Sequence, residues 1–376
     1  MTVSSHDVVV IGAGIVGAAC ALECVRRGMR VTILDGGVIG GGATAAGMGH
    51  IVVMDDSPAQ FALTKYSRQL WNELRAELPS EVEFERCGTI WVAADEEEME
   101  EVRRKYSYYT SRGVNAEIVN AAELAILEPN LRRGLAGGLL VPDDGVLYPP
   151  CAAGFLIECA KAQGVVIHLG KAVRQIGRGQ VRLSNGREIS AGFVVNATGA
   201  WAPELTPGLE IWKRKGHLVI TDRYPGFVRH QLVELGYLKS AHSISSDSVA
   251  FNVQPRKTGQ VLIGSSRQYG AESTEVEAEI TAKMLQRAQY YMPGLAQLSA
   301  IRAWAGFRPA TPDKLPLIGP SLEDPSIYIA AGHEGLGITT SLATGRLIAD
   351  QLTGADSQIP MEPYLPSRVA REPSHA

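Results

Sequence analysis

The sequence has few of the residues that build metal centres or disulfide frameworks. Its five cysteines, Cys20, Cys24, Cys87, Cys151 and Cys159, form no CxxC pair, and its eight histidines show no HxH or HExxH spacing. These absences exclude the common ligand patterns of zinc and iron–sulfur sites, so we expect no bound metal. An odd number of cysteines in a chain of this length is typical of reduced, mostly buried thiols in a cytoplasmic protein.

An excess of one charge and long apolar runs are missing as well. The chain has 36 basic and 40 acidic side chains, a formal net charge of −4, and so lacks the basic excess of a nucleic-acid-binding protein. The apolar stretch at residues 8–22 is shorter than the roughly 18–20 residues of a membrane span, and residues 1–7 lack the basic region of a secretory signal. We expect no nucleic acid, no transmembrane segment and a cytoplasmic location, with peripheral membrane association as the alternative.

Glycine, in contrast, is abundant, with 40 residues. Near the start, the β-branched run at residues 7–11 is typical of a buried strand. The motif Gly12-x-Gly14-x-x-Gly17 follows directly, and an alanine-rich helix is predicted from there to Arg27. A second strand at residues 30–34 ends at Asp35, so these elements predict a β-α-β unit of the dinucleotide-binding type.

Each glycine of this motif has a mechanical task. Gly12 permits a tight turn, Gly14 lets the backbone approach a pyrophosphate, and Gly17 lets the helix pack on the strand. The amino end of the helix would face the phosphates, and Asp35 can accept hydrogen bonds from the adenosine ribose. Because strand, helix and acid are in register, we interpret the motif as a dinucleotide site and not as a glycine-rich turn of another α/β fold.

Three later loops of small residues favour FAD over NAD as the dinucleotide. An NAD-dependent dehydrogenase, which stays the alternative, would continue with further βα repeats, whereas here residues 40–49 form a second glycine-rich segment. The predicted strand at residues 193–195 runs into Asn196-Ala-Thr-Gly199, and residues 332–337 form a last loop before a terminal helix. Small-residue loops at strand ends suit a long, extended FAD.

The remaining segments predict helices and an antiparallel region. Apolar stripes predict helices at residues 61–78 and 95–112. Residues 212–265 are predicted to form antiparallel strands. Thr274 with Glu277 predicts a capping box at the start of a helix that Pro293 ends.

Together, these motifs resemble the family of FAD-dependent amine oxidoreductases that contains D-amino-acid, glycine and sarcosine oxidases. The resemblance covers nearly the whole chain and rests, beyond the opening motif, on Gly41-Gly-Ala-Thr-Ala-Ala-Gly-Met48, Asn196-Ala-Thr-Gly-Ala-Trp201, Trp304-Ala-Gly-Phe-Arg308-Pro-Ala-Thr-Pro-Asp313 and Gly332-His-Glu-Gly-Leu-Gly-Ile338-Thr. It implies an α/β fold in which a Rossmann-like FAD-binding domain of the glutathione-reductase type is interleaved with a mixed or antiparallel-sheet substrate domain. The expected FAD-binding parts are residues 1–85, 146–210 and 304–376, and the expected substrate-domain parts are residues 86–145 and 211–303.

The resemblance also implies which residues bind FAD. The expected contacts are Gly12, Gly14, Ile15, Val16, Gly17, Asp35, Gly36, Gly42, Ala43, Thr44, Ala46, Gly47, Met48, Val173, Ala197, Thr198, Gly199, Trp201, Arg308, Gly335, Leu336, Gly337, Ile338 and Thr339. Monomeric sarcosine oxidases attach their flavin through a cysteine in the C-terminal third, and this chain has no cysteine after Cys159. We therefore expect non-covalent FAD.

For the substrate, the resemblance assigns Arg308, in a Gly-x-Arg-Pro motif, to the carboxylate, which fits the bidentate fork of a guanidinium. His50 and Glu334 are further candidates for the catalytic pocket, and either could contact a substrate hydroxyl between apolar walls from Met48, Leu336 and Ile338. The expected reaction is hydride transfer from the Cα of a small amino or imino acid to FAD. The motifs most resemble D-hydroxyproline dehydrogenases and the glycine-oxidising subunit of hydrogen cyanide synthase.

We expect cis-4-hydroxy-D-proline or D-proline as the substrate, with glycine or sarcosine as the alternative. A non-catalytic subunit that relays electrons also stays open. Two kinds of assembly are compatible with the sequence: a homo-oligomer, or a hetero-complex with electron-transfer subunits.

Overall fold

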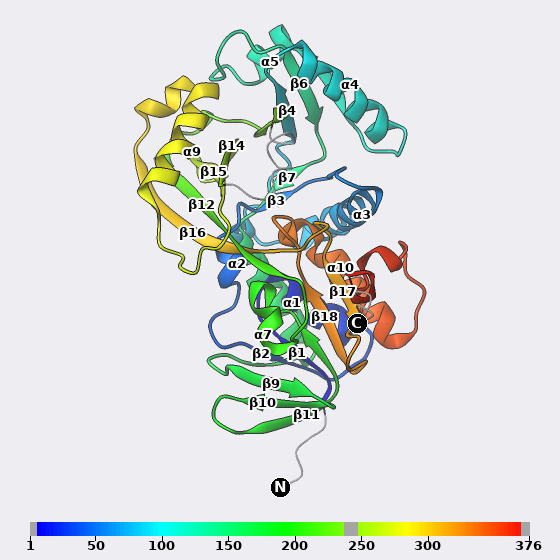
Figure 1. Cartoon of the computed structure of the whole chain (residues 1–376). Coiled ribbons are helices and arrows are strands. Elements are labelled where there is room, and N and C mark those ends of the chain that lie inside the picture. The colour runs from blue at the N-terminus through cyan, green and yellow to red at the C-terminus, as the bar shows by residue number, and fades with distance from the viewer. Residues whose placement is uncertain (1–5, 237–246, 370–376) are drawn as a thin grey trace, which may run out of the picture.

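Two eight-stranded sheets divide the molecule into two halves (Figure 1). The computed structural model describes residues 6–236 and 247–369. The first sheet has the strand order β17-β18-β11-β1-β2-β8, extended by β9 and β10, and the second has the order β16-β12-β15-β14-β13-β4-β6-β5. This arrangement confirms the predicted α/β class with a second, largely antiparallel sheet.

The first sheet contains the predicted β-α-β unit. Its central strands β11, β1 and β2 are parallel neighbours, and so are β18 beside β11 and β8 beside β2. Because parallel strands end at the same edge, the loops after β1, β11 and β18 meet there. The strands of this sheet are β1 (His6–Ile11), β2 (Val31–Leu34), β8 (Val166–His168), β9 (Val173–Gly177), β10 (Gln180–Leu183), β11 (Glu188–Asn196), β17 (Leu317–Pro320) and β18 (Ile327–Ala331).

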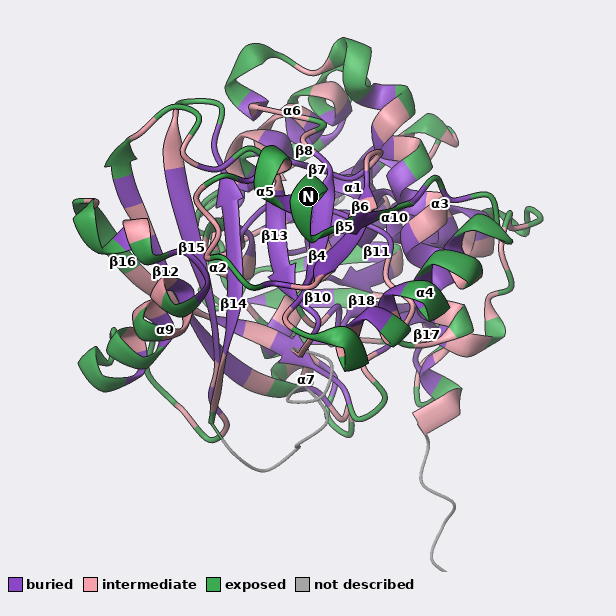
Figure 2. Ribbon diagram, turned by 90° about the horizontal axis from the view of Figure 1, so that it is seen from above, coloured by how far each residue is buried: buried purple, intermediate pink, exposed green. Residues whose placement is uncertain are grey.

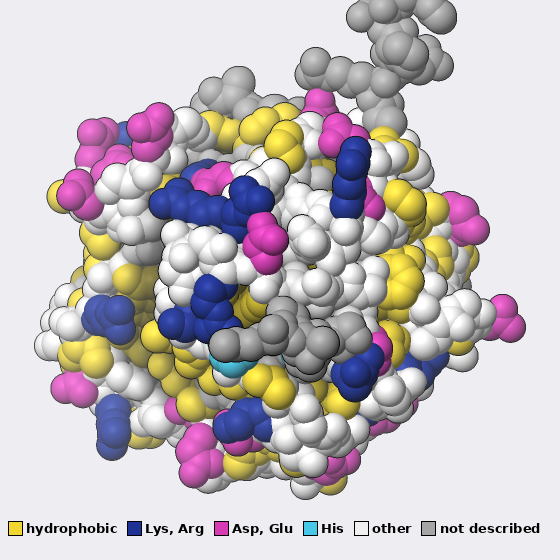
Figure 3. All heavy atoms as spheres, turned by 90° about the horizontal axis from the view of Figure 1, so that it is seen from below, with side chains coloured by type: hydrophobic (Ala, Val, Ile, Leu, Met, Phe, Trp, Pro, Cys, Tyr) yellow, Lys and Arg dark blue, Asp and Glu magenta, His cyan; other side chains and the backbone are white. Residues whose placement is uncertain are grey.

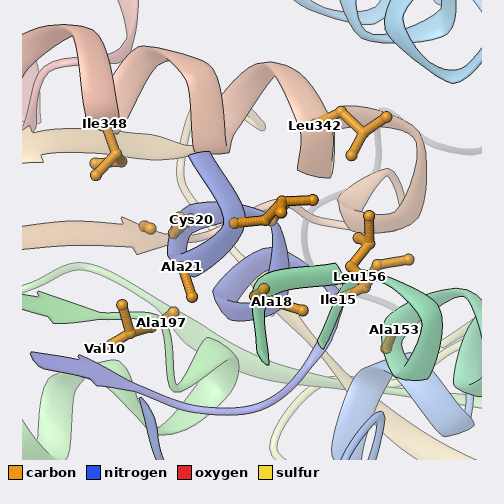
Figure 4. Packing of buried hydrophobic residues seen from close by; sticks show 14 of the residues in the cluster. Val10, Ile15, Ala18, Cys20, Ala21, Ala153, Leu156, Ala197, Leu342 and Ile348 are labelled. Carbon is orange, nitrogen blue, oxygen red and sulfur yellow. The ribbon is translucent and has the colours of Figure 1, made fainter. Parts of the chain in front are cut away.

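Small residues let the helices of this half approach one another closely. Figure 4 shows Ala18, Cys20 and Ala21 of α1 among side chains from its neighbouring helices, such as Leu156 and Leu342. A Cβ on Gly345 would lie 2.6 Å from the carbonyl oxygen of Ala19, so this contact requires glycine. The long helices here are α1 (Ile15–Arg26), α3 (Pro58–Leu74), α6 (Pro149–Ala162) and α10 (Gly337–Thr353).

The second sheet confirms the antiparallel region predicted at residues 212–265. Of its strand pairs, β13 with β4 is parallel and the others are antiparallel. Helix α9 (Ala278–Tyr291) covers one face of this sheet, and the other face is covered in part by α4 (Glu96–Thr110) and in part lines the cavity described below. The strands are β4 (Thr89–Ala93), β5 (Glu117–Asn120), β6 (Gly137–Val141), β12 (Trp212–Arg223), β13 (Gln231–Glu234), β14 (Ser248–Pro255), β15 (Gln260–Arg267) and β16 (Ala300–Ala310).

Shorter elements and one outer helix complete the chain. Strand β16 crosses the domain boundary expected between residues 303 and 304, and the domain division itself stays a prediction. Figure 2 shows exposed residues on outer helices such as α4 and buried residues along the strands. The other elements are α2 (Gly42–Ala45), β3 (His50–Ile51), α4 (Glu96–Thr110), α5 (Ala121–Leu127), β7 (Gly145–Val146) and α7 (Ala202–Leu205).

Two expectations about local structure are corrected. The predicted capping box is wrong, because α9 begins at Ala278 and no side chain caps it. The carboxylate of Glu277 instead accepts hydrogen bonds from Lys215 Nζ (2.7 Å) and Gln268 Nε2 (2.9 Å). The five thiols are free, as expected, but only Cys20 and Cys24 are fully buried, and the other three are partly exposed.

The described residues contain neither a candidate membrane span nor a candidate metal site. Within residues 6–236 and 247–369, no helix has both the length and the apolar composition to cross a bilayer. The same residues contain no group of three His, Cys, Asp or Glu side chains placed to hold a metal ion. On the face shown in Figure 3, basic and acidic side chains are interspersed with apolar ones.

Candidate active site

A cavity of about 830 Å³ lies between the two sheets and is lined by all the glycine-rich segments identified in the sequence. Of the residues predicted to bind FAD, only Gly17 and Thr339 do not line it. Gly17 packs the start of α1 against Gly12, and the Thr339 hydroxyl donates to the carbonyl of His50 (2.8 Å). The predicted residues that line the cavity are Gly12, Gly14, Ile15, Val16, Asp35, Gly36, Gly42, Ala43, Thr44, Ala46, Gly47, Met48, Val173, Ala197, Thr198, Gly199, Trp201, Arg308, Gly335, Leu336, Gly337 and Ile338.

The turn after β1 shows why this edge of the sheet is built from glycine. Gly12 has a φ of +110°, a conformation that favours glycine, and a Cβ there would lie 2.5 Å from the carbonyl oxygen of Ala197. The loops after β1 and β11 therefore touch through their backbones. This close approach leaves room for a ligand above both loops.

Gly14 and Gly17 are glycines for different reasons. A Cβ on Gly17 would overlap the carbonyl of Gly12, so the fold itself excludes a side chain at this position. A Cβ on Gly14 would meet one protein atom within 4 Å, Thr44 Oγ1 at 3.3 Å, and would project into the cavity. Gly14 also has an ordinary φ of −68°. The protein alone has little need of glycine there, whereas a pyrophosphate at the amino end of α1 needs the space, so the residues fit a dinucleotide.

Asp35 is placed at the other end of the same loop. Its Oδ2 accepts a hydrogen bond from the amide of Ala13 (2.6 Å), and its Oδ1 accepts one from the amide of Gly37 (2.6 Å). Each carboxylate oxygen has a second lone pair, and Asp35 lines the cavity. The side chain is thus oriented by the backbone and retains acceptors for the hydroxyls of a ribose.

Arg308 extends into the cavity from β16. It lies directly opposite Arg214 of β12, and its guanidinium lies over Gly216, where a Cβ would be 2.5 Å from Cζ. Its Nη1 donates to the carbonyl of Ser266 (2.8 Å). Burial, together with the charge of Arg214, lowers the pKa of Arg308 to about 10, so the group is still a cation at neutral pH.

The charge of Arg308 is not balanced by an acid of the described chain. Arg214 forms an ion pair with Glu334 and stacks at 4.5 Å over the ring of Tyr269, but Arg308 has no ion pair among residues 6–236 and 247–369. A buried cation of this kind favours an anionic ligand. Glu334, predicted as a pocket residue, lines the cavity with its carboxylate held by Arg214.

His50 lines the cavity beside the terminal loop. Its Nε2 lies 3.2 Å from the carbonyl of Gly335, which fits an Nε2–H donor. Burial, and to a smaller degree the charge of Arg308, lowers the pKa of His50 to about 4, so the ring is neutral at pH 7. Its Nδ1 is buried without a hydrogen-bond partner in the described structure, which leaves one acceptor near Arg308.

Sequence reasoning missed several polar residues of the cavity. Arg214 and Arg267 line it from β12 and β15, and burial with the neighbouring guanidiniums lowers the pKa of Arg267 to about 9. Trp91, Gln231 and Asn252 line it from β4, β13 and β14. These residues come from strands that pair only in the fold. The one local signal was alternation along β12, which places Arg214, Gly216 and Leu218 on one face.

Comparison with known proteins agrees with this geometry. A family model described as FAD dependent oxidoreductase matches residues 7–351. A glycine oxidase of Geobacillus kaustophilus is 28% identical over 374 residues, which cover 96% of each chain. The hydrogen cyanide synthase subunit HcnC of Pseudomonas aeruginosa is 29% identical over 424 aligned positions, which cover 98% of each chain.

Solved structures show the same fold. The glycine oxidase from Geobacillus kaustophilus superposes with a TM-score of 0.88 at 27% identity and covers 98% of this chain and 100% of its own. An L-proline dehydrogenase from P. horikoshii superposes with a TM-score of 0.86 at 26% identity and covers 97% of each chain.

Proposed function

The chain belongs to the family of FAD-dependent oxidoreductases that act on amino acids, and on this premise we propose that its substrate is a small D-amino or imino acid. We favour cis-4-hydroxy-D-proline, followed by D-proline, and the product is the cyclic imine. Bound FAD supplies the electron sink for the hydride from the substrate Cα.

The observation that carries the proposal is the guanidinium of Arg308. It is held over Gly216, faces the cavity and has no acidic partner among the described residues. A substrate carboxylate would balance the charge of this guanidinium and accept two parallel hydrogen bonds from it. Glu334 already neutralises Arg214, whereas Arg308 has no acidic partner among the described residues. We therefore assign the substrate carboxylate to Arg308 and not to Arg214.

The other residues of the site position the substrate and exclude water. No nucleophile is needed, because orientation and the cofactor carry the reaction. His50 is neutral, so it adds no further cation beside Arg308 and can accept a hydrogen bond from the substrate amine at Nδ1. Met48 and Ile338, both nearly buried, supply apolar walls.

The configuration of the substrate is a further part of the proposal. Arg308 fixes the carboxylate, and the flavin fixes the direction in which the Cα–H bond must point. The remaining substituents then have a single allowed arrangement, for which we propose the D configuration.

The names of the relatives support two substrates. The L-proline dehydrogenase supports a cyclic imino acid, although its named substrate is of the opposite configuration. The glycine oxidase and HcnC support glycine, which with sarcosine is the second candidate. HcnC is named as a synthase subunit, which supports a hetero-complex. A cytoplasmic location also belongs to this proposal.

The test is a comparison of kcat/KM with an artificial electron acceptor for cis-4-hydroxy-D-proline, D-proline, L-proline, sarcosine and glycine. We expect the hydroxylated D-imino acid to rank first. Glycine or sarcosine in first place would refute the cyclic substrate, and L-proline in first place would refute the D configuration. Absence of turnover with all amino acids, in protein that retains its flavin, would favour an electron-relay subunit.

A further inference from the structure

One face of the second sheet presents polar side chains to the cavity. Trp91 of β4 and Asn252 of β14 both lie opposite Val233 of β13, so the three residues form a row across three strands. Gln231 is two residues before Val233 and therefore shares its face. All four residues line the cavity. We refer to Trp91, Gln231 and Asn252 as the polar wall.

The polar wall is buried but lacks hydrogen-bond partners. Trp91 is 2% exposed, Gln231 3% and Asn252 9%. The indole Nε1 of Trp91, Oε1 of Gln231 and Oδ1 of Asn252 have no partner in the part of the chain that the structure describes. An unsatisfied buried polar group destabilises a fold, so three of them on one face would be a substantial penalty unless a ligand or water supplies their hydrogen bonds.

The packing of this sheet on its helices does not use the hydrogen-bonding atoms of the polar wall. The alternate residues of the same strands, Ile90, Leu232, Phe251 and Val253, point to the opposite face and pack with Met284 and Tyr291 of α9. On the face of the polar wall, Trp91 and Val233 pack with Met99 and Tyr109 of α4. The indole of Trp91 is fixed from behind, because Lys105 Nζ lies 4.7 Å from its ring. The polar wall thus borders the cavity, and its three unpartnered atoms are themselves buried at that border.

The polar wall lies near the guanidinium of Arg308. Asn252 pairs with Gly264 of β15, which is two residues from Ser266, and the Ser266 carbonyl accepts a hydrogen bond from Arg308. One strand spacing and two residues correspond to about 8 Å across the sheet. A five-membered ring that is held at Arg308 by its carboxylate could reach Asn252 with a substituent on its far side.

We infer that the polar wall, with Asn252 as its central residue, binds an uncharged hydrogen-bonding substituent of the substrate, namely a hydroxyl. This inference rests on the proposed oxidation of a small amino or imino acid at Arg308. The indole N–H is a donor, and the two amide oxygens are acceptors, a combination that suits a hydroxyl because a hydroxyl both donates and accepts. His50 and Glu334, named from sequence as hydroxyl contacts, are bonded to Gly335 and Arg214.

The test uses matched pairs of substrates that differ by one hydroxyl. The holoenzyme and its Asn252→Leu and Trp91→Phe variants are assayed with cis-4-hydroxy-D-proline against D-proline, and with D-serine against D-alanine. In wild type, we expect the hydroxylated member to have the higher kcat/KM. Each variant should lower the ratio of kcat/KM between the hydroxylated and the non-hydroxylated member by about three- to tenfold, the effect of one lost hydrogen bond. The control is Asn130→Leu, which removes an amide bonded to the Phe227 carbonyl (2.8 Å) outside the cavity and should leave the ratio unchanged.

A binding measurement separates specificity from turnover. Cyclopentanecarboxylate and cis-3-hydroxycyclopentanecarboxylate lack the amine and can be titrated through the flavin spectrum. Wild type should bind the hydroxylated acid more tightly, and Asn252→Leu should remove that difference. The inference is wrong if wild type has the same kcat/KM for both members of each substrate pair. It is also wrong if the variants lower kcat/KM equally for both members. Preference for iminodiacetate over all hydroxylated substrates would also overturn it, because the wall would then face a carboxylate.

The proposed function fails on a different result. If neither imino acid is oxidised but D-serine exceeds D-alanine and Asn252→Leu abolishes that preference, the cyclic substrate is refuted and the hydroxyl site is retained.

Discussion

Gly216 of β12 provides the surface on which the guanidinium of Arg308 rests. A Cβ at Gly216 would lie 2.5 Å from both Cζ and Nη2 of Arg308. The side chain of Arg308 is therefore directed by a residue on the neighbouring strand that has no chemistry of its own. This contact explains how a long, flexible side chain keeps one orientation in a wide cavity.

The first prediction follows from this contact. Gly216→Ala should displace the guanidinium and raise the KM for amino acids by about tenfold or more, the effect of losing a charge-assisted hydrogen bond. The flavin spectrum should stay nearly normal. In an Arg308→Ala background, Gly216→Ala should raise KM little further, because both substitutions remove the same interaction.

A matched control comes from Gly154→Ala in α6, where no atom lies within 4 Å of the added Cβ. Gly154→Ala should slightly raise the free energy of unfolding, because alanine favours a helix, and should leave KM unchanged. If Gly216→Ala also leaves KM unchanged, the guanidinium does not need this surface.

The second prediction compares two glycines of the opening motif. Gly14→Val should abolish FAD binding while the chain still folds, because its side chain would occupy the space of the pyrophosphate. Gly17→Val should prevent folding, because even a Cβ overlaps the Gly12 carbonyl. Flavin content and far-ultraviolet circular dichroism distinguish the two. Normal flavin content in Gly14→Val would show that the pyrophosphate lies elsewhere.

The third prediction concerns the attachment of the flavin. None of the described residues that line the cavity is a cysteine, so no thiol is placed to attach FAD. Acid precipitation should leave a colourless pellet and a yellow supernatant. A yellow pellet that survives washing would mean a covalent bond to another side chain.

Part of the fold and of the candidate site could be predicted from local sequence patterns. The β-α-β unit, Asp35 and the small-residue loops are local patterns, and each was placed correctly at the edge of one sheet because parallel strands end together. Arg308 was assigned through the resemblance of its Gly-x-Arg-Pro motif to the family, and its role stays a prediction. In contrast, Arg214, Gly216 and Asn252 gain their positions in the cavity from strand pairs between distant segments. Alternation along β12 puts Arg214 and Gly216 on one face, but it does not predict which residues lie opposite them.

The misassigned capping box has a similar cause. Thr274 and Glu277 have the correct spacing, but Glu277 accepts hydrogen bonds from Lys215 of β12 and from Gln268, the residue after β15. Tertiary partners thus override a local preference. The hydrogen bonds of His50 with the Gly335 carbonyl and of Glu334 with Arg214 likewise join residues that are far apart in the sequence.

The fourth prediction is a pH dependence of stability from His333. This buried ring lies with Nε2 2.9 Å from Thr344 Oγ1, and burial lowers its pKa from 6.5 to about 3. Between these values, the unfolded chain binds a proton that the folded chain does not. The free energy of unfolding should therefore fall as pH falls below about 6.5, by up to about 1.4 kcal/mol per pH unit for this one group.

Denaturant unfolding between pH 7 and 5 measures the effect. His333→Gln should show a shallower decline than wild type, whereas the same change at the exposed His168 should keep the wild-type slope. Equal slopes for all three proteins would assign the acid sensitivity to other groups.

The most direct measurement of the central claim is anaerobic reduction of the bound flavin in wild type, Arg308→Ala and Arg308→Lys, followed by stopped-flow absorbance with the best substrate of the panel. We predict that wild type bleaches fully, and that Arg308→Ala needs a substrate concentration roughly 10- to 150-fold higher for half of its limiting rate, equivalent to about 1.5–3 kcal/mol. Arg308→Lys should recover only part of this loss, because an ammonium lacks the fork of a guanidinium. An unchanged half-saturating concentration in Arg308→Ala, with flavin content intact, would contradict the binding of a substrate carboxylate by Arg308.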